Sequence, residues 1–220
     1  MLDILYEDNH LLAVNKPAGI ATMGVRGESL VTLAREYIKR EHHKPGNVYL
    51  GVVSRLDIFT SGVVLFARTS KAAARLTEQF RSRRVQKTYW AILDGRVQPT
   101  SGRLEDWLRK DEARQRMMVV DRTAAGALQA ELSYRLLRTI ATGSLVEIDL
   151  HSGRKHQIRV QFAARGWPVC GERKYARARP FDAGLALHAR RLIVEHPTTK
   201  EPVDLVAPLP RSWPELGPLS

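Results

Sequence analysis

Short apolar runs rich in β-branched residues, each closed by turn residues, constrain the fold of this chain most. Runs of this kind are typical of β-strands. Only three stretches space their apolar residues as an amphipathic helix does, over residues 29–40, 70–83 and 155–165, and Ser70 is the expected N-cap of the second. Strands are expected over residues 2–6, 11–15, 87–93, 128–137, 145–150, 185–194 and 203–206, with two more apolar runs around a polar loop within 48–68. Residues 96–126 are polar with weak strand signals, so we expect irregular structure there.

The order of these elements favours an α+β fold: a mixed, mainly antiparallel sheet with flanking helices. Many of the strands follow one another through short turns, as in hairpins, and the helices are too few for a parallel doubly wound sheet. The sequence contains no internal repeat, heptad pattern or Gly-, Ser- or Pro-rich linker. We therefore expect one compact catalytic unit over residues 1–220, with a Pro-rich tail from 208 to 220.

The charge balance points to a polyanionic partner. The chain has 35 Lys and Arg against 23 Asp and Glu, which gives a formal net charge of +12. An excess of this size favours nucleic acid, although a solvated basic surface is the alternative interpretation. The single cysteine, Cys170, excludes an internal disulfide. The first residues include no apolar stretch of secretory or membrane length, so we expect a cytoplasmic protein that does not bind membranes.

A polar loop between two apolar runs carries the first candidate site. Asp57 follows Arg55 by two residues in the segment Ser54-Arg55-Leu56-Asp57 and precedes Thr60-Ser61-Gly62. A carboxylate among apolar neighbours needs a partner to stay charged. Composition alone favours a turn-forming aspartate over a catalytic one.

That segment resembles the signature of the RluA family of pseudouridine synthases, H-R-L-D followed by T-S-G. In that family the aspartate is the essential nucleophile, so the resemblance implies this role for Asp57. Ser54 stands where the family usually has histidine, and this departure bears on target preference or loop geometry. The flanking segments Leu12–Gly19 and Leu185–His196 also match the family, so the similarity spans nearly the whole chain.

Two further motifs carry the resemblance. Lys87-Thr88-Tyr89-Trp90-Ala91 is similar to the family's K-x-Y-x-A strand, in which the tyrosine lies beneath the target base. The segment from His151 to Val160 resembles T-G-R-x-H-Q-I-R-V, with serine for threonine at 152 and Gln161 where the family has histidine. By this match the catalytic residues are Asp57, Tyr89 and Arg159, and the Arg159 guanidinium would hold the carboxylate of Asp57.

The resemblance also implies the reaction and its requirements. The chain would have the pseudouridine synthase catalytic fold and convert uridine to pseudouridine in a stem-loop of transfer or ribosomal RNA. This isomerisation needs no cofactor and no metal. The residues implied to contact RNA are Arg55, Arg154, Lys155 and His156. We expect a monomer that has no separate N-terminal RNA-binding domain.

Two other functions are compatible with the composition. A noncatalytic basic RNA-binding protein would explain the charge without an active-site carboxylate. A metal-dependent RNA hydrolase would use His151 and His156 as ligands, but no third ligand lies at suitable spacing in the sequence. One assay, for pseudouridine and for strand breaks in RNA incubated without cofactor, separates the three functions.

Overall fold

A computed structural model describes residues 2–24, 28–141 and 143–214. The described chain forms two compact units. The first comprises the residues up to Gln86 together with Ala189–Pro210, and the second contains Lys87–His188 and the described residues from Arg211 on. The prediction of one catalytic domain over the whole chain stays a prediction, and each unit is described separately.

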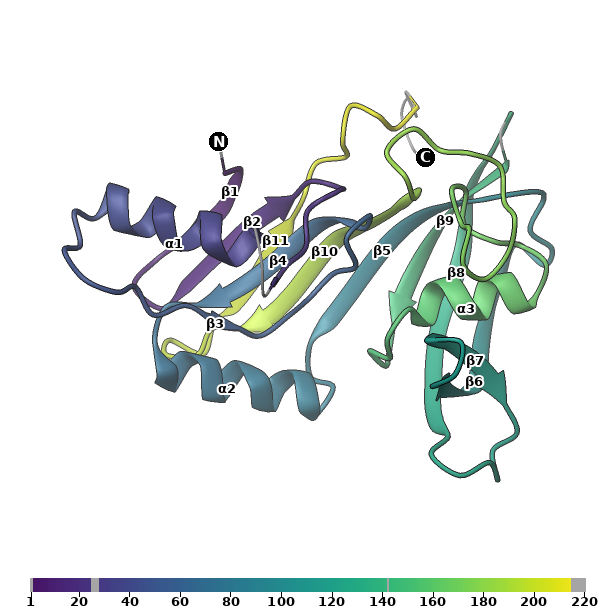
Figure 1. Cartoon of the computed structure of the whole chain (residues 1–220), viewed down its shortest axis with the longest axis horizontal. Helices are drawn as coiled ribbons and strands as arrows, with labels where there is room; N and C mark the ends of the chain where they lie inside the picture. The colour runs from purple at the N-terminus through teal and green to yellow at the C-terminus, as the bar shows by residue number, and fades with distance from the viewer. Residues whose placement is uncertain (1, 25–27, 142, 215–220) are drawn as a thin grey trace. The chain divides into compact units, whose positions relative to one another are not determined.

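The first unit is a mainly antiparallel sheet with a helix on each face (Figure 1). The order of its strands is β1-β2-β4-β10, with β11 paired to β10 and β3 paired to β4. The strands are β1 (Ile4–Glu7), β2 (Leu11–Lys16), β3 (Gly51–Val52), β4 (Ser61–Ala67), β10 (Leu187–Glu195), which enters this unit at Ala189, and β11 (Pro202–Val206).

Helices α1 (Leu30–Glu41) and α2 (Ser70–Arg81) explain why β2 and β4 are almost wholly buried. Side chains alternate between the two faces of a strand, so each face receives every second residue. Leu12 and Phe66 pack in one apolar cluster with residues of α1. Leu11 and Leu65 pack in another with residues of α2. The continuous apolar runs in the sequence therefore reflect a sheet covered on both sides.

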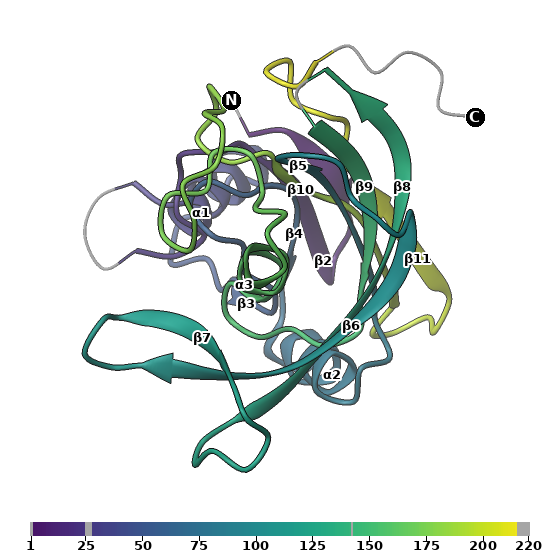
Figure 2. The same ribbon diagram turned by 90° about the vertical axis from the view of Figure 1, so that its right-hand side faces the viewer.

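The second unit is an antiparallel sheet of order β5-β9-β8-β6-β7. Helix α3 packs against it through Val160, which joins Leu108, Met117 and Ala130 in an apolar cluster. Figure 2 shows β6 and β7 as a hairpin at one end of this sheet. The elements are β5 (Gln86–Leu93), β6 (Ser101–Asp111), β7 (Arg116–Val120), β8 (Leu128–Ile140), β9 (Gly143–Leu150) and α3 (Gln157–Ala164).

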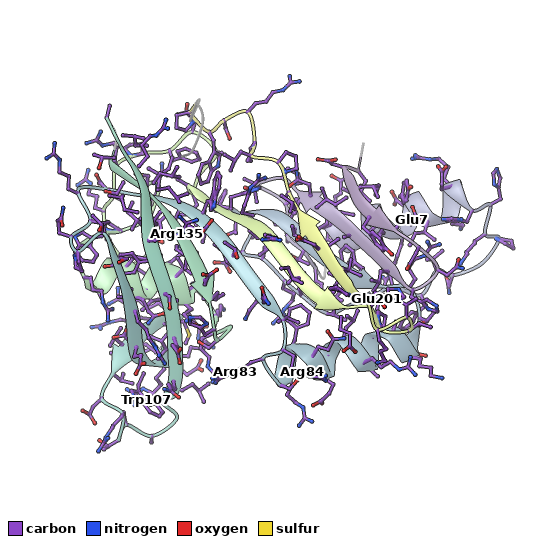
Figure 3. The ribbon with its side chains drawn as sticks, turned by 180° about the vertical axis from the view of Figure 1, so that it is seen from behind. Glu7, Arg83, Arg84, Trp107, Arg135 and Glu201 are labelled. Atoms are coloured by element: carbon purple, nitrogen blue, oxygen red, sulfur yellow. The ribbon has the colours of Figure 1, made fainter. Side chains whose placement is uncertain are left out.

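The α+β class and the mainly antiparallel pairing are confirmed, as are the three helices among the described residues. Arg83 and Arg84, which follow α2, are exposed (Figure 3). The predicted hairpin at residue 141 also forms between β8 and β9, although Thr142 lies outside the described residues.

The prediction of irregular structure over residues 96–126 was wrong, because this region contains β6 and β7. Only Leu104 and Leu108 of β6 are fully buried, and their partners are Leu132 and Leu128 of β8. Charged residues occupy much of the rest of the strand, so the apolar signal in the sequence was weak. Pairing with β8 on one side and β7 on the other holds this strand in place.

Two helix starts also differ from the prediction. Thr69, rather than Ser70, caps α2, because Thr69 has extended backbone and its hydroxyl accepts a hydrogen bond from the amide of Ala72 at 3.1 Å. Helix α3 begins at Gln157, two residues later than expected, because His156 adopts a left-handed backbone conformation with φ of 54°. Within the described residues no helix combines the length and apolar character needed to cross a bilayer.

Candidate active site

Asp57 lies in the loop that connects β3 to β4 in the first unit. It opens a β-turn in which its carbonyl accepts a hydrogen bond from the amide of Thr60 at 3.1 Å. The side chain of Asp57 is partly buried, whereas that of Arg55 is exposed. Strand β4 begins directly after the turn, so the most buried strand pair of this unit anchors one end of the loop.

Side chains hold the backbone on the N-terminal side of this turn. The hydroxyl of Thr22 accepts from the amide of Leu56 and donates to its carbonyl, both at 3.1 Å. Ser54 accepts from the amide of Leu65 in β4 at 3.0 Å. The serine that departs from the family signature therefore ties the loop to the sheet.

Gly62, which ends the Thr-Ser-Gly part of the motif, must be glycine for steric reasons. Its φ is +111°, a region that residues with a Cβ rarely adopt. A Cβ at this position would lie 2.2 Å from the carbonyl oxygen of Ala189 in β10. The glycine thus allows β4 to approach β10 closely just after the turn that carries Asp57.

Lys16 is the main support of this loop, and it was missed in the sequence. It ends β2 and is fully buried. Its ammonium donates to the carbonyls of Pro17, Ile20 and Ile58 at 2.9, 2.8 and 2.9 Å, and so links two separate chain segments. Burial lowers the pKa of Lys16 to about 8, and the negative charge of Asp57 opposes this shift. Lys16 is therefore a buried cation whose charge interacts with Asp57.

Tyr89 lies in the second unit, on β5. It faces Ile148 in the register of β5 with β9, and its side chain is partly buried. The expected strand over residues 87–93 is thus confirmed.

Arg159, on α3, forms a two-point ion pair with Glu172. Its Nε and Nη2 donate to the two carboxylate oxygens at 2.7 and 3.0 Å. The side chain of Arg159 is 14% exposed and that of Glu172 is 0% exposed. Burial by itself raises the pKa of Glu172, but the hydrogen bonds and charge of Arg159 outweigh it, with help from two backbone amides. The pKa of Glu172 is therefore held below its ordinary value.

Tyr175 joins Arg159 to one of the predicted RNA contacts. The Arg159 guanidinium lies 5.4 Å from the centre of the Tyr175 ring, a cation–π geometry. The Tyr175 hydroxyl is hydrogen bonded to Nδ1 of His156 and accepts from the amide of Met117. The guanidinium of Arg159, the ring of Tyr175 and the imidazole of His156 are thus linked by direct contacts within the second unit.

The remaining predicted RNA contacts lie just before α3. Lys155 is exposed, and Arg154 is partly buried with its Nε donating to the carbonyl of Gln129 at 3.0 Å. Gln161, at the position where the family has histidine, is buried and donates to Asp106 at 2.7 Å. This departure therefore contributes to the packing of α3 on the sheet.

The two histidines of the hydrolase alternative have different hydrogen-bond partners. His151 is hydrogen bonded to Ser133 at 2.8 Å, whereas His156 is hydrogen bonded to Tyr175. Among the residues that the structure describes, no three His, Cys, Asp or Glu side chains are grouped as ligands of a metal ion.

The seven predicted site residues fall into both units. Asp57 and Arg55 belong to the first unit, and Tyr89, Arg154, Lys155, His156 and Arg159 belong to the second. Sequence reasoning missed Lys16, Glu172 and Tyr175. A lysine at the end of an apolar strand, and an acidic residue after the glycine that follows Cys170, were the only signals for the first two.

Comparison with known proteins agrees with this arrangement of motifs. Residues 10–164, which include Asp57, Tyr89 and Arg159, match the family described as RNA pseudouridylate synthase. The chain belongs to this family. It is thus an RNA pseudouridine synthase, an isomerase whose substrate is RNA.

Relatives of this synthase resemble it along almost its full length. It is 34% identical to the uncharacterized RNA pseudouridine synthase YhcT of Bacillus subtilis, over 98% of this chain and 71% of that protein. It is 33% identical to ribosomal large subunit pseudouridine synthase D of Xylella fastidiosa, over 98% of this chain and 68% of that protein. Among solved structures, human RNA pseudouridylate synthase domain containing 4 has a TM-score of 0.79 at 28% identity, covering 95% of this chain and 89% of that one.

Proposed function

We propose that Asp57 is the nucleophile with which this synthase converts a uridine of structured RNA to pseudouridine. The observation that carries the proposal is the support of its turn: the buried ammonium of Lys16 and the hydroxyl of Thr22 fix the backbone on both sides of Asp57. A carboxylate on a fixed backbone is preorganised, which catalysis by a positioned group requires.

The reaction breaks the bond between the ribose C1′ and N1 of uracil, and then joins C1′ to C5. The proton on C5 is lost and N1 gains one, so the atoms balance without an oxidant or reductant. Within this proposal, Asp57 attacks the flipped-out nucleotide, and the bond that its carboxylate forms is broken again before pseudouridine is released, which regenerates the enzyme. The ring of Tyr89 stacks on the uracil. Arg159 stabilises negative charge at the site. Its ion pair with Glu172 supports this role by fixing the plane of the guanidinium.

RNA binding is assigned to basic side chains around the motifs. Arg55, Arg154 and Lys155 would contact phosphates, since cations that bind phosphates release counterions from RNA. His156 would contact the RNA with its ring oriented by the hydrogen bond to the hydroxyl of Tyr175. We further propose that the enzyme acts as a monomer on a stem-loop in the cytoplasm, where transfer and ribosomal RNA are found.

Large-subunit ribosomal RNA is the first substrate to test. The support for it is the name of the Xylella fastidiosa relative, a ribosomal large subunit synthase. Transfer RNA is the second substrate to test. Incubating the enzyme with each RNA separately distinguishes the two.

Release of tritium from RNA labelled at C5 of uridine tests the proposal, because the C5 proton leaves only when the carbon bond forms. The wild-type enzyme should release tritium without added cofactor, and Asp57→Asn should release less than a few per cent of that amount. Asp182→Asn, which neutralises an exposed carboxylate, is the matched control and should keep wild-type turnover. RNA affinity should persist in Asp57→Asn. Turnover above a few per cent in that variant would refute the role of Asp57, and binding without tritium release by the wild type would favour a noncatalytic RNA-binding protein.

A further inference from the structure

The tip of the turn that carries Asp57 consists of two large apolar side chains. Ile58 and Phe59 occupy the two central positions between the Asp57 carbonyl and the Thr60 amide. They are 49% and 52% exposed. Central turn positions usually hold Gly, Pro, Asn, Asp or Ser, which suit the backbone geometry and water. An isoleucine and a phenylalanine at this place have no explanation in the turn itself.

Exposure of this pair does not reflect a poorly packed loop. Thr60 and Ser61, which follow directly, are 3% and 2% exposed. Leu56, which precedes Asp57, packs against the apolar cluster beneath α1. The residues that directly flank the turn are therefore buried or partly buried, whereas its two central side chains face solvent. Among the described residues, Ile58 and Phe59 are the one consecutive pair of exposed large hydrophobic side chains.

The backbone of the tip is also fixed. The carbonyl of Ile58 accepts from the amide of Gly19 and from the ammonium of Lys16, each at 2.9 Å. Because these bonds use the backbone, they leave both side chains available for another molecule. Because the backbone is already fixed, a ligand that covers these side chains need not order the loop, which lowers the entropic cost of the contact.

We propose that Phe59, together with its exposed neighbour Ile58, is a stacking surface for an unpaired nucleobase of the RNA substrate, next to the uridine that reacts. This rests on the proposed function, because it places the base beside Asp57. The exposed guanidinium of Arg55, in the same loop, supplies positive charge for the phosphates of the same strand. Proteins bind single-stranded nucleic acid with aromatic rings that stack on the bases and cations that hold the backbone, and this loop offers one of each.

Binding of a labelled single strand by the full-length enzyme tests the proposal. The probe is a ten-nucleotide oligouridylate with one 2-aminopurine, whose fluorescence falls when it stacks on an aromatic ring. Phe59→Ala should weaken binding about tenfold, equivalent to about 1.4 kcal/mol, and relieve the quenching. Phe59→Trp should retain both, and Phe59→Leu should keep part of the affinity without the quenching.

Tyr49→Ala is the matched control. Tyr49 is an aromatic residue of the same unit that is 51% exposed, and its ring lies beside Gly51 and Ala73 of α2 rather than on the turn. This variant should bind the probe as the wild type does. Because Phe59 is half-exposed, Phe59→Ala should also melt within a few degrees of the wild type, which circular dichroism would establish.

Salt dependence separates stacking from charge. Phe59→Ala should lower affinity by the same factor at every salt concentration, whereas Arg55→Gln should reduce the log–log slope by about 0.7. Equal binding and quenching by Phe59→Ala and the wild type would overturn the proposal. So would a loss of self-association in Phe59→Ala with unchanged RNA binding, which would assign the pair to a protein contact. Tritium release by Asp57→Asn reports on the nucleophile alone, so failure of the proposed function would be recognised independently.

Discussion

Glu172→Gln removes one charge from the buried pair with Arg159 and keeps the volume of the side chain. In the native pair, Oε1 of Glu172 accepts from Nη2 of Arg159 and from the amides of Lys174 and Tyr175, at 3.0, 2.8 and 3.2 Å. Oε2 accepts only from Nε of Arg159, at 2.7 Å. The glutamine oxygen should therefore take the Oε1 position, where three of these four bonds survive. Its amide nitrogen then faces Nε of Arg159, so that two donors oppose each other.

The expected cost follows from the burial of the pair. Breaking a buried ion pair by neutralising one partner costs about 3–5 kcal/mol of the free energy of unfolding. Urea unfolding at pH 7 measures this change. The control is Asp204→Asn, which breaks the ion pair between Asp204 and Arg191. The side chain of Arg191 is 48% exposed and that of Asp204 is 44% exposed. Exposed pairs contribute about 0–1 kcal/mol, so the two variants should differ severalfold.

The same variant predicts a change in pH dependence. The folded state holds the pKa of Glu172 below its ordinary value of 4.5, so the carboxylate stabilises the protein above that pH. This contribution is lost as the pH falls through the folded-state pKa. The difference between wild type and Glu172→Gln should therefore shrink below pH 4.5. A cost under about 1 kcal/mol at pH 7, or a difference that stays constant to pH 3, would refute the assignment of stability to this charge pair.

Three further predictions concern other parts of the molecule. Burial lowers the pKa of Lys16 to about 8, below its unfolded value of 10.5, so the charged amine destabilises the folded state. The free energy of unfolding of the wild type should therefore rise by about 3 kcal/mol between pH 8 and 10.5. Urea unfolding of Lys16→Met should lack this rise. Tyr89→Phe should keep the fold and RNA affinity, and wild-type tritium release by this variant would limit Tyr89 to stacking. Thr69→Ala removes the cap of α2 and should cost about 1 kcal/mol in thermal or urea unfolding, whereas Ser70→Ala should cost a few tenths.

Elements with a continuous apolar run or with apolar residues at helical spacing were predictable from the sequence. Strands β2 and β5 and helix α1 lie within one or two residues of their expected bounds. The β6–β7 hairpin was not predictable, because β6 buries only two side chains completely and relies on neighbouring strands. Local sequence carries no information about such pairing.

The candidate site shows the same limit. Motif resemblance selected Asp57, Tyr89 and Arg159, but it said nothing of the residues that support them. The role of Lys16 depends on the carbonyl of Ile58, which is 42 positions away along the chain. Glu172 is 13 positions from Arg159 and is buried only because the chain folds back after α3. Supports of this kind are set by tertiary structure, so a single sequence does not reveal them.

The loop around Asp57 is held by its own backbone atoms at Leu56 and Ile58, whatever side chains those positions carry. Lys16 and Gly19 bind the carbonyl of Ile58, and Thr22 binds the amide and carbonyl of Leu56. The identities of the side chains at positions 55, 58 and 59 are therefore decoupled from the conformation of the loop. A library randomised at these three positions should yield mostly folded proteins, and selection from it offers a route to synthases retargeted to new RNA sequences without rebuilding the scaffold.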